Sequence, residues 1–335
     1  MNITEKTIKI KVLDFLRKYG ISERSKILVG YSGGPDSSAL LWILNDIQKS
    51  LGFSLHAVYI DHGIRSEKEM SAEYIQIKKI VAEPNLPFHI RHIAQGEIAS
   101  QSKVTGRSIE DIAREYRYRL IEEIKKEIDA SHIAMGHTLD DQFETLIMRF
   151  FQGSGIHGLA GIPEKREYFI RPLIMLEKGE IMEYINSNSI PYVVDKTNLD
   201  TVYLRNKVRL KLIPVIAEIF PGYRKSLSTF SEKMDSIRSV LTSNTPPLKV
   251  ELTNEGNTWF YSDDFFAKPD YQQVETIYKS WNMWENRPFN RLPYRFISAA
   301  LDYKPVGGSN ILIQGYTCQL LHHKEKIIWK RVVVV

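Results

Sequence analysis

Short apolar runs alternate with segments of helical period through the N-terminal part of the chain. Four runs have the length and composition of strands: residues 26–31, 55–60, 87–94 and 132–135. Between them, at 38–50, 67–83 and 108–128, apolar residues recur every three or four positions, as in helices. This alternation predicts an α/β fold, a doubly wound and mostly parallel sheet with helices on both faces. Ligands of such sheets bind at the carboxyl ends of the strands.

The pattern changes further along the chain. Runs at 168–173 and 191–198 extend the sheet, and a basic helical stretch follows at 203–225. The helical period continues to Pro246 and Pro247, which end it. We place a domain boundary near residue 215, within this connector. Residues 1–215 then form the sheet domain, and residues 216–335 hold the helical connector and a smaller α+β domain that ends in two strands, at 310–321 and 326–335.

Composition and charge narrow the picture only slightly. A chain of 335 residues, 43% hydrophobic and 25% charged, buries one large core or two moderate ones. Residues 1–20 predict a charged amphipathic helix, unlike a signal peptide or a membrane span, which favours a cytoplasmic protein. The single cysteine, Cys318, excludes an internal disulfide framework and a cysteine-rich metal site, and we expect it buried in a strand. The net charge of +5 is weak support for a polyanionic partner.

The junction between the first strand and its helix has the sequence VGYSGGPDSS, at residues 29–38. Glycines here allow a tight turn and close backbone approach, and the amide groups of a helix N-terminus favour an anion such as phosphate. Neither a Walker A loop nor a Gly-x-Gly-x-x-Gly pattern is present. Asp36 is out of place beside phosphate unless a cation bridges the two, so it is our first candidate ligand for Mg²⁺. The alternative is a plain βα turn in which Asp36 or Ser37 caps the helix.

A histidine and two acids follow the fourth strand. His137, Asp141 and Glu144 have the spacing i, i+4, i+7, so a helix would place them on one face. Apolar residues suited to the buried face are Phe143, Leu146, Ile147 and Phe150. Acids this close repel one another unless a cation arrives. The alternative is a solvated acidic helix start, which the helix dipole favours.

At this point the motifs resemble a known family. SGGPDSS at 32–38 resembles the phosphate loop of the N-type ATP pyrophosphatases, which cleave ATP to AMP and pyrophosphate and adenylate an oxygen of their substrate. Further motifs resemble those of tRNA(isoleucine)-lysidine synthetases, in the same order: YIDHGIR at 59–65, IAREYRYRLI at 112–121, GHTLDDQFET at 136–145, RPLI at 171–174 and DKTNLDTVYLRNKVRLKLIP at 195–214. The resemblance covers residues 25–215 and implies a Rossmann-like catalytic domain, ATP as a substrate and Mg²⁺.

The resemblance also implies a reaction and its partners. Such enzymes use ATP to activate C2 of the wobble cytidine in the CAU anticodon of an isoleucine tRNA. Free L-lysine then attacks this carbon through its ε-amine and displaces AMP. Because that amine is mostly protonated at neutral pH, a base must first take a proton. The oligomeric state stays open, with a homodimer as one alternative.

Roles follow for the matching positions. The resemblance implies that the loop binds the phosphates and Mg²⁺ and that the end of the second strand binds adenine. It implies that the two acids bind lysine or the metal. The loop residues are Ser32, Gly33, Gly34, Asp36, Ser37 and Ser38, and the adenine residues are Tyr59, Ile60 and Asp61. Asp141 and Glu144 hold lysine or, with Asp36, the metal, and His137 contacts phosphate or handles a proton. Any one of these three, Asp141, Glu144 or His137, is a candidate base.

Two basic positions and one departure complete this set. Arg114, three residues before Arg117 on a predicted helix, and Arg205 are expected to meet phosphate or developing charge. Exposed arginines paired with nearby glutamates are the alternative. His157 stands in the glycine-rich segment 151–163 where the family usually has arginine, which puts a tRNA contact there in doubt.

Beyond residue 215 the resemblance is loose. The aromatic residues there stack on RNA bases or, as core packing favours, fill the interior: Trp259, Trp281, Trp284 and Tyr294. Three rival functions share the opening loop. A tRNA thiolase generally needs paired cysteines, a glutamine-dependent synthetase needs a nucleophile motif that is not found here, and a non-catalytic nucleotide or tRNA sensor does not need the acidic row.

Overall fold

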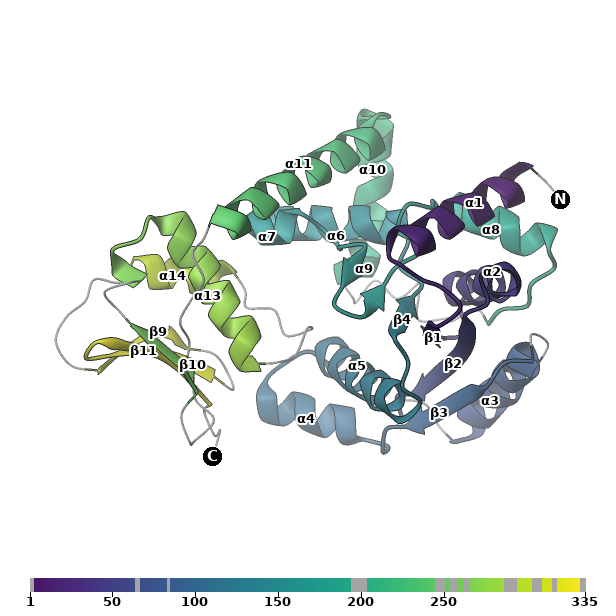
Figure 1. The fold of residues 1–335 in the computed structure, drawn as a ribbon, viewed down its shortest axis with the longest axis horizontal. Coiled ribbons are helices and arrows are strands. Elements are labelled where there is room, and N and C mark those ends of the chain that lie inside the picture. Colours follow the sequence, from purple (N-terminus) through teal and green to yellow (C-terminus); the bar gives the residue numbers. More distant parts are fainter. Residues whose placement is uncertain are drawn as a thin grey trace. The chain divides into compact units, whose positions relative to one another are not determined.

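The computed structural model describes residues 3–63, 67–82, 85–193, 204–244, 251–252, 258–261, 265–285, 294–302, 309–314 and 318–331. The chain divides into two compact units, coloured along the sequence in Figure 1. Unit 1 comprises Met1–Ser102, Arg107–Thr145 and Ile162–Tyr223, and unit 2 comprises Lys103–Gly106, Leu146–Gly161 and Arg224–Val335. The domain boundary near residue 215 stays a prediction.

Unit 1 is built on a six-stranded sheet with the strand order β3-β2-β1-β4-β6-β5. Its strands are β1 (Lys26–Gly30), β2 (Ser54–Asp61), β3 (Phe88–His92), β4 (His132–Met135), β5 (Lys165–Arg166) and β6 (Phe169–Ile170). All neighbours pair in parallel except β5 with β6. The chain moves outward from β1 to β3 and then returns to the other side of β1 as β4. The mostly parallel, doubly wound sheet expected from the sequence is therefore confirmed, with a reversal point between β1 and β4.

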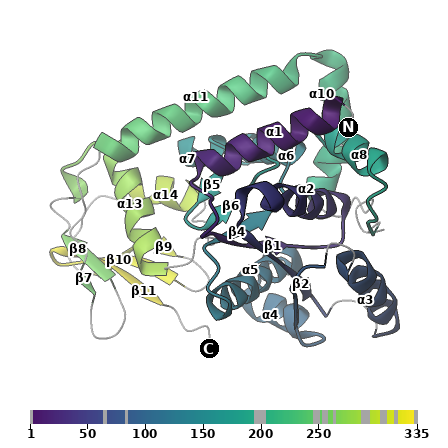
Figure 2. The ribbon, with the colours of Figure 1, turned by 45° about the vertical axis from the view of Figure 1, so that its right-hand side comes forward.

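Helices cover both faces of this sheet. The helices that begin in unit 1 are α1 (Ile3–Lys18), α2 (Pro35–Leu51), α3 (Glu67–Ala82), α4 (Glu97–Thr105), α5 (Ile109–Glu127), α6 (Leu139–Phe151), α8 (Lys178–Ser187), α9 (Leu204–Lys207), the π-helical turn η2 (Val208–Leu212) and α10 (Ile213–Ile219). Figures 1 and 2 show α2 and α5 on opposite faces of the sheet. Ser108 caps α5 by accepting a hydrogen bond from the Asp111 backbone, as its sequence predicts.

Successive strand residues point into two different cores. Ile27 and Val29 of β1 pack with residues of α1, α2, α3 and α8. On the other face, Tyr118 of α5 packs edge-on against Phe169 of β6, with ring centroids 5.4 Å apart. This alternation buries β1 from both sides, and the buried strand fixes the position of the loop that follows it.

The structure differs from several expectations. The helix expected to run unbroken through residues 203–241 ends at Ile219 and restarts at Tyr223, because Pro221 and Gly222 interrupt it. The run 168–173 contains only the short strand β6, and residues 191–193 are not a strand, while 194–198 lie outside the described residues. Helix α4 was not expected. The run 310–321 divides between two strands, so the C-terminal region has one strand more than predicted there.

Unit 2 contains a five-stranded antiparallel sheet in the order β7-β8-β11-β10-β9. Its elements are α7 (Ile156–Leu159), α11 (Tyr223–Asn244, whose first residue belongs to unit 1), β7 (Glu251–Leu252), β8 (Thr258–Tyr261), α13 (Asp270–Glu285), α14 (Tyr294–Leu301), β9 (Ser309–Gln314), β10 (Cys318–His323) and β11 (Lys326–Arg331). Trp281, Trp284 and Trp329 pack together in its core. Core packing thus accounts for two of the four aromatic residues singled out above. The side chains of Trp259, Tyr294 and Cys318 lie outside the described set. No described helix is long and apolar enough to cross a membrane.

Candidate active site

The loop between β1 and α2 has the geometry of a phosphate cradle. Gly33 adopts a φ of +80°, which side chains with a Cβ rarely tolerate. Gly34 is the N-cap of α2 and leaves the first turn without a side-chain cap. The Ser37 hydroxyl donates to the Gly34 carbonyl at 2.9 Å and accepts from the Ser32 amide at 3.2 Å, so it braces the turn. Ser38 is fully buried, with its hydroxyl 3.2 Å from that of Tyr31, and supports the loop from within.

A second loop approaches this cradle at the reversal point of the sheet. A Cβ on Gly136, directly after β4, would lie 3.2 Å from backbone atoms of Asp36 and Ser37. A Cβ at this distance from backbone would be unusually tight, so glycine suits the close approach of the two loops. Thr138 and Asp141 then form a reciprocal cap at the start of α6: the Thr138 amide donates to Asp141 Oδ2 at 2.8 Å, and the Asp141 amide donates to Thr138 Oγ1 at 3.4 Å.

This cap corrects one expectation. Helix α6 begins at Leu139, so His137 precedes the helix and does not share a helical face with Asp141 and Glu144. Phe150, expected on the buried face, is 62% exposed, whereas Phe143, Leu146 and Ile147 are buried as expected.

Asp36 forms an ion pair with Lys178, the first residue of α8. The Lys178 backbone amide also donates to Asp140 Oδ2 at 2.7 Å, which links α8 to the start of α6. Burial raises the pKa of Asp36, and repulsion from Asp141 adds to this effect, while Lys178 opposes it. Asp36 and Asp141 therefore lie within electrostatic reach of each other.

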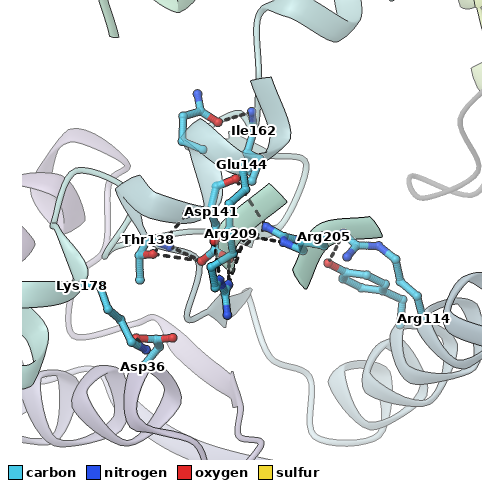
Figure 3. A network of polar contacts seen from close by, with 11 residues as sticks. Asp36, Arg114, Thr138, Asp141, Glu144, Ile162, Lys178, Arg205 and Arg209 are labelled. Carbon is cyan, nitrogen blue, oxygen red and sulfur yellow. Dashed lines mark hydrogen bonds and ion pairs between the residues drawn. The ribbon is translucent and has the colours of Figure 1, made fainter. Parts of the chain in front are cut away.

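Asp141 and Glu144 are held by two arginines (Figure 3). Arg205 Nε donates to Glu144 Oε2 at 2.7 Å, and Arg205 Nη2 donates to Asp141 Oδ1 at 2.9 Å. Arg209 donates to both oxygens of Glu144, from Nε at 2.5 Å and from Nη2 at 3.1 Å. The Glu144 side chain is only 2% exposed, and that of Asp141 is 17% exposed. The cationic partner that this acid pair requires is thus supplied, at least in part, by the chain itself.

Arg114 and Arg117 lie on α5 around the buried ring of Tyr118. Arg114 Nη2 donates to the Tyr118 hydroxyl at 3.0 Å, and the two guanidinium carbons lie 4.9 and 5.9 Å from the ring centre. Burial and the nearby arginines, Arg171 first, hold the pKa of His137 well below its usual range. His137 is therefore neutral at physiological pH.

The end of β2 lies beside the cradle in the sheet, as expected for Tyr59, Ile60 and Asp61. The Asp61 carboxylate accepts from the Gly63 amide at 3.0 Å and lies 2.9 Å from His92 Nδ1. Its side chain thus fixes the turn after β2. Contact of these three residues with adenine stays a prediction.

The donor set at Asp36 and Asp141 fits Mg²⁺. Among the described residues, no group of three or more His, Cys, Asp or Glu side chains is arranged to hold a metal ion. Mg²⁺, however, commonly takes one or two protein carboxylates and completes its shell with phosphate and water. Two repelling carboxylates beside a phosphate cradle provide that arrangement.

His157 lies in unit 2 and is engaged there. Its Nε2 pairs with Glu275 Oε1, and its ring lies 4.2 Å from that of Tyr278. Glu275 is 2% exposed and also accepts a hydrogen bond from Thr242 Oγ1 at 3.0 Å. The histidine that departs from the family pattern thus joins α7 to α13 within this unit.

Two residues of the site were missed from the sequence. Arg209 follows Arg205 by one helical turn, a spacing that indicates a shared face toward the acids. Lys178 has no such local signal, since it meets Asp36 across 142 residues of chain.

Comparison with known proteins agrees with this geometry. Residues 4–216 match the family model of a PP-loop domain. A tRNA(Ile)-lysidine synthase of Borreliella burgdorferi (strain ZS7) is 40% identical over 346 residues, covering 99% of this chain and 74% of the relative. That of Thermosipho africanus (strain TCF52B) is 36% identical over 273 residues, covering 81% of this chain and 61% of the relative.

Among solved structures, the U34-tRNA thiolase NcsA from Methanococcus maripaludis matches with a TM-score of 0.58 and 19% identity, over 69% of this chain and 78% of that chain. This likeness supports the fold alone. The PP-loop match and the 40% identity over 99% of this chain go further than the fold. They show that the chain belongs to the tRNA(Ile)-lysidine synthase family of ATP-using PP-loop enzymes.

Proposed function

We propose that this protein is a cytoplasmic ligase that uses ATP to join free L-lysine to C2 of the wobble cytidine in the CAU anticodon of an isoleucine tRNA. The products besides lysidine are AMP and pyrophosphate. The observation that carries the proposal is the meeting of a phosphate cradle and a buried acid pair where the sheet reverses, between β1 and β4. Open α/β sheets bind their ligands at this position.

The cradle provides for the phosphates of ATP. The amides of the first turn of α2 have no side-chain cap and can donate to phosphate oxygens, aided by the helix dipole. Lys178 is paired with Asp36 beside this turn, so we assign it to neutralising the phosphates once Mg²⁺ occupies Asp36. Mg²⁺ held by Asp36 and Asp141 would supply charge neutralisation for the departing pyrophosphate.

We assign different roles to the two acids, a structural role to Glu144 and a ligand-binding role to Asp141. Glu144 is almost fully enclosed and accepts three hydrogen bonds from Arg205 and Arg209, so we assign it to holding the segment α9–η2 on α6. Asp141 is more exposed than Glu144 and keeps a lone pair on Oδ1 beside its hydrogen bonds to Thr138 and Arg205, so it is the more accessible acid for one cation, either Mg²⁺ or the ammonium group of lysine. Arg205 touches both acids, and we assign it to the developing charge at the α-phosphate.

Removal of a proton from lysine falls to His137 in this scheme. Its imidazole is neutral, and Nδ1 has no hydrogen-bond partner within the described part of the chain. Its pKa is low because arginines surround it. An anion bound among those arginines would cancel part of the repulsion and bring the pKa of His137 nearer to the working pH of a general base.

The test is a product assay. Purified protein is incubated with ATP, Mg²⁺, radiolabelled lysine and an isoleucine tRNA transcript bearing CAU, and digested RNA is searched for a lysine-bearing cytidine. We expect label at the wobble position, none with Asp36→Ala, and none with a methionine tRNA. The exposed Asp14 of α1 gives the matched control, because Asp14→Ala removes the same group away from the site.

Two other outcomes would overturn the proposal in different ways. Release of AMP that depends on tRNA but leaves no lysine on the RNA would retain adenylation and remove lysine as the nucleophile. ATP binding by folded protein without either product would instead identify a nucleotide or tRNA sensor.

A further inference from the structure

A group of basic side chains, one buried and two half-buried, remains after the ion pairs of the site are assigned. Arg117 lies on α5, Arg171 follows β6, and His137 follows β4, so three elements of unit 1 contribute to it. Nε of Arg117, Nε of Arg171 and Nδ1 of His137 are buried, and none has a hydrogen-bond partner within the described residues. Arg171 as a whole is 4% exposed. Arg117 and Arg171 both lie within electrostatic reach of His137. Buried polar groups are nearly always bonded, so three such neighbouring atoms call for a missing partner.

The charges around this group identify the sign of that partner. Four arginines act on His137: Arg171, Arg114, Arg205 and Arg117. Of the acids that follow His137, Asp140 accepts from the Lys178 amide, and Asp141 and Glu144 accept from Arg205 and Arg209. Burial lowers the pKa of Arg117 and of Arg171, and repulsion from Arg114 adds to this effect, while Tyr118 opposes it at both residues and Glu110 opposes it at Arg117. A buried uncompensated charge is costly, so the site is built for an anion that arrives from outside.

The cationic groups are also held in place before any ligand binds. Arg171 Nη1 donates to the Pro163 carbonyl at 2.8 Å, which fixes the guanidinium and leaves Nε free to donate. Arg114 is tied to the Tyr118 hydroxyl at 3.0 Å, and Tyr118 is 1% exposed. Rigid guanidinium forks match the oxygens of phosphate in pairs, whereas they match a chloride ion or a single carbonyl poorly.

We propose that Arg117 and Arg171, with Arg114 and His137, form a receptor for a second phosphate group, separate from the cradle at the start of α2. The inference rests on the proposed function, because it assigns this receptor to a phosphate of that reaction. Two sources have this chemistry: the RNA backbone at the wobble nucleotide, and the pyrophosphate end of ATP. His137 follows β4, which lies next to β1 and its cradle, whereas Arg171 follows β6, which lies one strand further away. This offset of Arg171 from the cradle favours the RNA.

Binding measurements without turnover test the proposal. Arg117→Met removes the charge and keeps an apolar stem of similar length. Arg119→Met is the matched control, since Arg119 lies on the same helix with its side chain 51% exposed. The tRNA transcript is titrated without ATP at several salt concentrations, and ATP with Mg²⁺ is titrated separately without RNA. Arg117→Lys and Arg171→Lys, which keep the charge and lose the fork, are measured in the same way.

We expect Arg117→Met to weaken tRNA binding by about tenfold and to make the dependence of log Kd on log salt shallower by about 0.7 to 0.9, one phosphate contact. Arg119→Met should leave both unchanged, and the lysine variants should recover part of the affinity. Weaker ATP binding in place of weaker tRNA binding would assign the receptor to the nucleotide. The thermal midpoint of Arg117→Met should be unchanged or higher, because an uncompensated charge is removed.

Unchanged affinity for both ligands in Arg117→Met and in Arg171→Lys would overturn the proposal. A lower thermal midpoint in Arg117→Met would do so as well, since it would show that the arginine is structural. Failure of the proposed function is distinguishable, because it is detected as absent lysidine in the unmodified protein, whereas these titrations form no product.

Discussion

Two ion-pair systems stand at the carboxyl edge of the same sheet, and they are built differently. Asp36 and Lys178 form a single pair whose side chains are 29% and 40% exposed. Glu144 is 2% exposed and is bonded by two guanidinium groups, one of which also reaches Asp141. Figure 3 shows the first pair apart from the second cluster in that view. The first can exchange its partner for a ligand at little cost, whereas the second must stay closed for the fold to survive.

The largest effect is expected when the closed system is broken at its centre. Glu144→Ala leaves two arginines beside Asp141 without their buried partner, so the free energy of unfolding should fall by about 3 kcal/mol and lysidine formation should be lost. Urea denaturation and the product assay measure the two effects. Unchanged stability would show that Glu144 is a substrate ligand and does not hold α9 and η2 on α6.

A milder change keeps the charge and removes the fork. Arg209→Lys loses at least one of the two hydrogen bonds to Glu144, so we expect a loss of about 1 kcal/mol of stability and reduced kcat. Lys211→Met, which removes an exposed cation from the same η2 segment, is the control. Equal stability of Arg209→Lys and the unmodified protein would argue that one guanidinium, Arg205, suffices to close the cluster.

The open system should respond in the opposite way. Lys178→Met breaks a half-buried pair, so stability should change by only about 1 kcal/mol, while KM for ATP should rise about tenfold. The Lys178→Arg variant should recover part of the affinity. A large loss of stability in Lys178→Met would remove the distinction between the two systems, and an unchanged KM would remove Lys178 from phosphate binding.

The smallest expected effect is a pH dependence of stability, and it comes from a histidine pair that belongs to neither ion-pair system. His56 Nδ1 and His89 Nε2 lie 3.0 Å apart, and burial lowers the pKa of both below the ordinary 6.5. The unfolded chain therefore binds more protons in the window below 6.5, so stability is full above it and falls on acidification. The thermal midpoint should drop between pH 7 and pH 5, and His89→Gln should flatten this slope. An unaltered slope would assign the effect to other groups.

The sequence predicted the strands and the loop that carry the site better than the side-chain contacts within it. The strands β1 to β4, the loop at 32–38 and the Ser108 cap were predicted because hydrophobic period, glycine and capping residues are local signals. His137 was predicted to lie on the helix because the capping pattern Thr138-x-x-Asp141 was overlooked. With Thr138 as the cap, α6 begins at Leu139. Lys178 was not accessible at all, because its partner is fixed by the packing of α8 against α2 and not by any local pattern.

The same limit applies to the arginine cluster. Arg205 was found through its motif, yet neither spacing nor resemblance indicated that it would bind Asp141 and Glu144 at once. Arg171 carried no assigned role, although its burial is what the receptor proposed above depends on. Whether a buried arginine nitrogen lacks a hydrogen-bond partner depends on the folded structure, and the residue type alone does not predict it.

The π-helical turn Val208–Leu212 has a consequence for how this segment tolerates change. It lies between α9 and α10 without a break, and Arg209 is its second residue. Pro214 follows closely, and a proline lacks the amide that an α-helix needs at that point. A π turn accommodates one residue more than an α-helical turn over the same length. Removing one residue after Arg209 would therefore restore an α-helical turn over the same length and keep α9 and α10 in their present relation, whereas adding a residue would rotate α10 by about 100° relative to α9. We expect this segment to tolerate a single deletion better than a single insertion.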